Sequence, residues 1–160
     1  MFPDWGAHYR HLGGRHIGQD EHMAQTDVPV LMLDGSRFSD LEGFYDEVSE
    51  HLIPGSEWGR NLDAFNDILR GGFGTPDGGF LLRWSNSNLS MERLGWAETI
   101  RFVEKKLTTC HPQNVPRVEA DLAAARCHKG ETLFELIVDI IRKHGEGGSE
   151  AVDNVSLILD

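Results

Sequence analysis

The sequence predicts an α/β protein built on a three-stranded parallel sheet that is packed by helices. Three short apolar runs have the length and composition of buried strands, at residues 30–33, 80–84 and 155–159. Segments with a helical spacing of apolar residues lie between them, so every connection is far longer than a hairpin turn. Parallel strands joined by helical crossovers satisfy this order. The 160 residues are enough to bury such a core without a disulfide or metal staple.

The first strand is followed by a turn at residues 34–35 and then by a predicted helix. Ser39 and Glu42 have the spacing of a capping box, which predicts that the helix begins there. A Pro-Gly pair at residues 54–55 would end it. The apolar positions of this helix recur with helical spacing: Phe38, Leu41, Phe44, Tyr45, Val48 and Leu52.

A second helix is predicted to begin at Asn61, whose side chain can cap it, and to end at Gly71-Gly72. Its apolar residues would face the core: Leu62, Phe65, Ile68 and Leu69. The opposite face would then carry four polar residues: Asp63, Asn66, Asp67 and Arg70.

The strand at residues 80–84 follows the turn-rich stretch GTPDGG, and three more helices are predicted before the last strand. Two are amphipathic, over residues 96–107 and 115–126. Thr132 and Glu135 form a second capping box, and the helix that they open would end at residues 145–148. Apolar residues surround most of this last helix, which predicts burial on more than one side: Phe134, Leu136, Ile137, Val138, Ile140 and Ile141.

The chain divides into a flexible leader, residues 1–27, and one domain, residues 28–160. The leader lacks both apolar periodicity and the apolar core of a secretory signal. Its four histidines could bind a metal, but a solvated tail is the simpler interpretation. The chain has no apolar stretch long enough to span a membrane, and its two cysteines suit a reducing compartment. We therefore expect a cytoplasmic protein.

The net charge of −11 argues against nucleic acid as a direct partner, because phosphate binding needs clustered cations. The excess is concentrated in residues 34–67, which hold nine acidic and two basic residues, a net charge of −7. This concentration on the first two helices and their loop indicates a face for a cationic partner.

Asp63 and Asp67 lie one turn apart on the predicted second helix. The simplest interpretation is a solvated helix face, with Asp63 also stabilised by the helix dipole. The pair could instead perform acid–base chemistry or coordinate a cation, but the sequence fixes no histidine or third carboxylate beside it.

Other candidate sites are weak. The pairs Cys110-His111 and Cys127-His128 have zinc-ligand chemistry, but the helix predicted between them would separate them by about 18 Å. Trp84 and Trp96 are better explained by packing than by a cofactor. The chain has neither a phosphate-binding P-loop nor a nucleophile elbow. We therefore expect no catalytic residues, no cofactor and no metal, and expect that the protein is not an enzyme.

Residues 58–69, WGRNLDAFNDIL, resemble the signature of the barstar family of intracellular ribonuclease inhibitors: an aromatic residue, Gly-x-Asn-Leu-Asp-Ala, an apolar residue, then Asp and Leu. The resemblance runs from the first strand to the terminal strand and implies a barstar-like fold. The leader lies outside it. Residues 85–130 would be a helical expansion at a place where smaller members have a short link.

The resemblance implies a protein that occludes the active site of a cationic ribonuclease with the second helix and the loop before it. Asp67 would be the main phosphate mimic and Asp63 a second acidic contact. Asn61, Leu62, Gly59 and Ala64 would serve the fold. The flanking contacts implied by the resemblance are Glu57, Trp58, Asn66 and Gly71.

The resemblance also implies a free monomer that binds its target one to one. Asn66 and Glu57 stand where aromatic residues are common in the family, so the target surface could differ. The register near the last helix offers either Lys143 or Asp139 at the place of a family acidic contact, so that contact has no secure match and is not transferred to this chain. Two other functions stay open: an immunity or regulatory domain for a non-ribonuclease toxin, and a metal-dependent hydrolase that uses Asp63 and Asp67.

Overall fold

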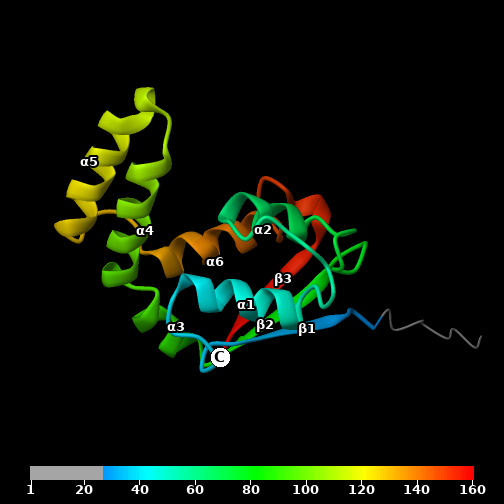
Figure 1. Ribbon diagram of the computed structural model, residues 1–160. Helices are drawn as coiled ribbons and strands as arrows, with labels where there is room; N and C mark the ends of the chain where they lie inside the picture. Colours follow the sequence, from blue (N-terminus) through cyan, green and yellow to red (C-terminus); the bar gives the residue numbers. More distant parts are fainter. Residues whose placement is uncertain (1–26) are drawn as a thin grey trace, which may run out of the picture.

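The computed structural model describes residues 27–160, so the predicted leader lies almost entirely outside the described residues (Figure 1). Nine helices and strands follow in order within this part of the chain: β1 (Val30–Asp34), α1 (Leu41–His51), α2 (Leu62–Leu69), β2 (Phe80–Ser85), α3 (Ser87–Arg93), α4 (Trp96–Thr109), α5 (Val115–Arg126), α6 (Leu133–Lys143) and β3 (Val155–Leu159). Short 3₁₀ turns precede α5 and β3, at Pro112–Asn114 and Ala151–Asp153.

The three strands form one parallel sheet in the order β1-β2-β3, which confirms the predicted architecture. Central strand β2 places Trp84 beside Leu33 of β1 and beside Leu159 of β3. Each crossover between neighbouring strands contains helices, as the spacing of the apolar runs predicts.

Helices cover one face of the sheet. Leu33, Leu82 and Trp84 point to that face and are fully buried. Within residues 27–160 no helix covers the other face (Figure 1), and Met32 and Ile158 are exposed on it. Helices α1 and α6 lie against β1 and β3 respectively, and α2 packs against α6. The core between helices and sheet is rich in aromatic rings, with Phe44 stacked on Trp84 at a centroid distance of 5.6 Å.

The predicted capping box at Ser39 is wrong, because α1 begins one residue later. Asp40 is the N-cap, and its Oδ1 accepts the Gly43 N–H at 2.8 Å. Ser39 and Asp40 are both good N-cap residues, and the backbone becomes helical only after Asp40. The Leu41 N–H is satisfied from a distant part of the chain, by Oε1 of Glu98 in α4 at 3.0 Å.

The capping box at Thr132 and Glu135 is confirmed at the start of α6. Two further N–H groups of this first turn donate hydrogen bonds to residues in or just before the first turn of α4. The Leu133 N–H donates to Oγ1 of Thr99 at 2.8 Å, and the Phe134 N–H donates to the Leu94 carbonyl at 3.0 Å. The buried end of α6 therefore leaves none of these donors without an acceptor.

Helices α4 and α5 form an antiparallel hairpin that stands at one end of the molecule (Figure 1). Its two helices, both predicted from their periodicity, enclose a small apolar cluster of Val103, Val118 and Leu122. The short helix α3 before it was not predicted. Cys110 and Cys127 are unpaired at the two ends of the α5 segment. None of the helices in residues 27–160 is long and apolar enough to cross a membrane.

Candidate functional site

Helix α2 presents its polar side to solvent because most of its apolar side is buried. Phe65, Ile68 and Leu69 are at most 1% exposed. Asn61 caps the helix, and its Oδ1 accepts the Ala64 N–H at 2.8 Å. Gly71 follows the last turn with φ of +88°, a conformation that favours glycine. The buried residues of α2, together with its cap at Asn61 and its end at Gly71, thus determine which of its side chains face solvent.

The outward face carries Asp63, Asn66 and Asp67, as predicted, and they line one hollow of about 580 Å³. Asp63 is exposed and makes no ion pair with any of residues 27–160. Asp67 is different, because its Oδ1 lies 2.7 Å from Nη1 of Arg70. The same guanidinium also bonds to Glu150 through Nε at 2.7 Å. This bond holds the pKa of Glu150 below its ordinary range.

Beneath α2 lies a buried polar network that the sequence did not reveal. The ring of His144, at the C-terminal end of α6, is fully buried. Its Nε2 lies 3.0 Å from Oδ1 of Asn66, and its Nδ1 lies 2.6 Å from Oδ2 of Asp153. Asn66 is therefore half-buried and tied to α6, so it positions α2 whether or not a partner also contacts it.

The loop before α2 is held against α1. Nε1 of Trp58 donates to Oγ of Ser49 at 2.8 Å, and its ring stands edge-on to Tyr45 at 5.4 Å between centroids. Burial raises the pKa of Tyr45 to about 12. Glu57, just before Trp58, is exposed. The loop is thus anchored by Trp58 and presents Glu57 to solvent.

Four of the nine carboxylates in residues 34–67 are paired with Arg37 or Arg60, the two bases that the net charge of −7 already includes. Arg60, at φ of +48°, lies 2.9 Å from Asp46 and 3.5 Å from Glu42. Its hydrogen bond to Asp46 is the main reason why the pKa of Arg60 is raised. Arg37 pairs with Glu47 and Glu50 in the same way, at 2.9 and 2.8 Å.

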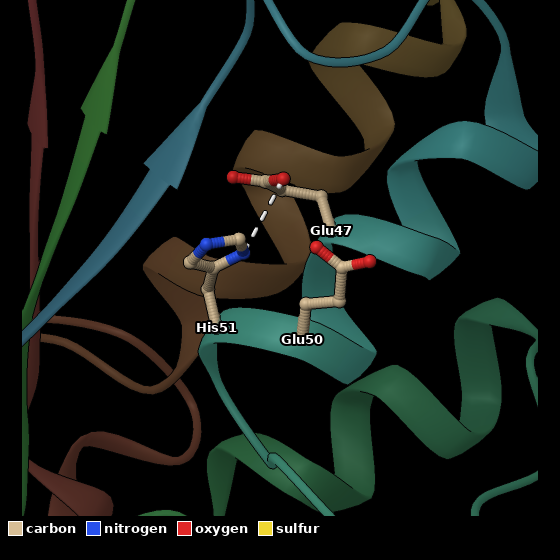
Figure 2. Close-up of side chains that lie close together, drawn as sticks. All are labelled: Glu47, Glu50 and His51. Carbon is tan, nitrogen blue, oxygen red and sulfur yellow. Dashed lines mark ion pairs between the residues drawn. The ribbon is translucent and has the colours of Figure 1, made fainter.

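Glu47, Glu50 and His51 lie close enough together to suggest a metal site, and all three side chains leave α1 (Figure 2). Glu47 is nearly buried, but both of its oxygens have partners: the Asp34 N–H and Arg37 Nε, each at 2.9 Å. His51 Nδ1 approaches Glu47 at 3.4 Å without hydrogen-bond geometry. The group is better explained as a salt-bridged link between β1 and α1.

Asp63 and Asp67 belong to neither of the two groups of residues 27–160 whose ligand atoms lie close enough together to hold a metal ion. The second group is His144, Glu150 and Asp153, whose side chains take part in the network beneath α2. The Cys110-His111 and Cys127-His128 pairs are not in either group. The carboxylate pair of α2 therefore gains no support here as a catalytic metal site.

Comparison with known protein families agrees with this arrangement. A family model described as Barstar (barnase inhibitor) matches residues 28–115, which is more than half of the chain. The chain belongs to the barstar family. Barstar family members are inhibitors and not enzymes, and the family implies binding to a ribonuclease. No individual curated protein matches the sequence.

The barstar match confirms the resemblance seen in residues 58–69, and it begins where the periodic part of the sequence begins. All six predicted contact residues lie within the matched range. The match covers β1 to α4 and ends at the first residue of α5, so α6 and β3 lie beyond it. The structure nevertheless places β3 beside β2, as expected for the barstar-like fold.

Proposed function

We propose that this barstar family member binds a cationic ribonuclease one to one and occludes its active site with α2 and the preceding loop. One observation carries the proposal: Asp63 and Asp67 are both exposed on one face of a helix whose other face and N-terminal end are fixed by the core. Carboxylates held in this way can occupy the positions in which a ribonuclease binds phosphates, and they form charge-assisted bonds with its cations.

Arg70 and Glu150 orient this face. Arg70 holds Oδ1 of Asp67, so the carboxylate does not have to be ordered when a partner binds. The partner's cation must share Asp67 with Arg70, whereas Asp63 has no competing cation among the described residues. We infer that both carboxylates contribute, and that Glu57, Trp58, Asn66 and Gly71 surround them at the interface.

A second candidate function is immunity to a toxin that is not a ribonuclease. The observation that favours it is that two of the predicted contact residues already have partners within the chain. Asp67 is paired with Arg70, and Asn66 with His144. Asn66 and Glu57 also stand where aromatic residues are common in the family, and this departure fits a target that differs from barnase. In both cases the protein acts by binding, and its unpaired cysteines fit a role in the cytoplasm.

An inhibition assay with barnase and a panel of purified cationic ribonucleases tests the proposal. Asp67→Ala should raise the dissociation constant about 30-fold or more, as for a central charged contact. The matched control is Asp139→Ala on α6, because Asp139 is a half-exposed aspartate that, like Asp67, lies three residues before an arginine. Both variants should melt within a few degrees of the wild type.

Equal losses of affinity in the two variants would place the binding face elsewhere. Capture of a different toxin without inhibition of any ribonuclease would favour the immunity function. Tight binding of a divalent metal that is lost in Asp63→Asn would instead support the metal-dependent hydrolase.

A further inference from the structure

The hairpin of α4 and α5 stands beside the candidate binding face, and α4 forms the far wall of the hollow in front of α2. This hollow, about 580 Å³, is bounded by α2, by Phe102 and Lys106 of α4 and by one face of α6. A second hollow of about 410 Å³ continues it along α1 and the loop before α2. The two share Asn61, Phe102 and Lys106, so they form one groove.

The walls of this groove carry opposite charges. Asp63 and Asp67 lie on the α2 side, whereas Lys106 lies on the α4 side and Lys143 at the end of α6. Within residues 27–160, neither lysine forms an ion pair, and neither does Asp63. The apolar residues that line the hollow between these charges are Leu62, Phe102, Leu136 and Ile140.

We propose that the hairpin is the second half of the partner-binding surface, and that the groove between α2 and α4 receives a projecting part of the same protein that α2 binds. The inference rests on the proposed function. Charge complementarity defines the occupant: a segment with basic side chains toward Asp63 and Asp67, an acidic side chain toward Lys106, and apolar atoms between them. A site with charges of both signs also fixes the orientation of the partner.

The wall formed by α4 is rigid enough for this role, because its first turn is bonded to two core helices. Glu98 accepts the Leu41 N–H at the start of α1, and Thr99 accepts the Leu133 N–H at the start of α6. Both residues are more than nine-tenths buried. Binding therefore does not have to order the hairpin, which lowers the cost of using it as a contact surface.

The test measures association and dissociation rates of purified full-length variants with barnase and the panel of cationic ribonucleases. Lys106→Glu reverses the charge of the far wall, and Lys143→Glu does so at the end of α6. The matched control is Arg126→Glu, which makes the same charge change on the same hairpin at a residue that lines neither hollow. Circular dichroism and thermal melting establish that each variant is folded.

Lys106→Glu should weaken binding about tenfold or more, mainly by faster dissociation, as expected for a charge inside the interface. Arg126→Glu should change only the association rate, and modestly. Equal effects of Lys106→Glu, Lys143→Glu and Arg126→Glu, with Asp67→Ala still defective, would refute the role of the hairpin and leave the proposed function intact. A wild-type protein that binds no ribonuclease would refute both.

Discussion

Thr99 makes a buried hydrogen bond whose removal has a definable cost. Its Oγ1 accepts the Leu133 N–H at 2.8 Å, and it donates to the Gly95 carbonyl at the same distance. Thr99 is 7% exposed and Leu133 is fully buried. In Thr99→Val the side chain keeps its shape but loses the acceptor. The Gly95 carbonyl retains the Thr99 N–H as a donor, so only the Leu133 N–H is left unsatisfied.

A buried donor without a partner costs about 1–3 kcal/mol. For a chain of this size each kcal/mol lowers the melting temperature by about 2–4 °C, so Thr99→Val should melt about 2–12 °C below the wild type. Urea denaturation followed by circular dichroism should show the same loss with an unchanged denaturant slope.

The control is Thr108→Val, on the same helix, where the hydroxyl is exposed and bonds only to the Lys105 carbonyl. This change should alter the free energy of unfolding by less than about 0.5 kcal/mol. If Thr99→Val is as stable as Thr108→Val, the start of α6 does not depend on α4, and this hydrogen bond does not hold the hairpin rigidly against the core.

Three further predictions concern the turn after α2, the core and the binding rates. Gly71→Ala should lose about 1–2 kcal/mol from the left-handed backbone and more from crowding against the Pro76 carbonyl, which would lie 3.1 Å from the new Cβ. Gly55→Ala should lose only the first amount in urea denaturation, because nothing lies near its Cβ. Since the pKa of Tyr45 is raised from 10.0 to about 12, the unfolded chain releases the phenol proton first, so the free energy of unfolding should fall as the pH rises above 10.0; Tyr45→Phe should abolish this fall. Association with a cationic ribonuclease should slow as salt is added, whereas an association rate independent of salt would argue against electrostatic steering.

The sheet and most helices could be predicted because their signals are local. Apolar runs, periodic apolar faces and glycine or proline breaks each lie within a few residues, and the Thr132–Glu135 capping box needs only a three-residue spacing. The start of α1 was misplaced by one residue because Ser39 and Asp40 can both cap a helix. Helix α3 was missed because its seven residues are mostly polar and follow Asn86, at a left-handed φ of +53°.

The candidate site was predictable in its outline but not in its electrostatics. The helical spacing placed Asp63, Asn66 and Asp67 together correctly. The network behind them depends on contacts between distant parts of the chain: His144 is 78 residues from Asn66, and Glu150 is 80 residues from Arg70. A count of charges within residues 34–67 also has no access to pairs with cations outside that segment, such as Asp67 with Arg70 and Glu42 with Lys105, so it overstated how much of the acidity is available to a partner.

The caps supplied by Glu98 and Thr99 have a consequence for protein design. A shortened version made by joining α3 directly to α6 would remove the side chains that complete the ends of α1 and α6, and it would leave the Leu41 and Leu133 N–H groups without acceptors. The α4–α5 hairpin, which would be an addition to a smaller barstar-like fold, thus supplies contacts that complete two helices of the core. A minimal inhibitor derived from this chain would need two replacement caps before its binding face could be reused.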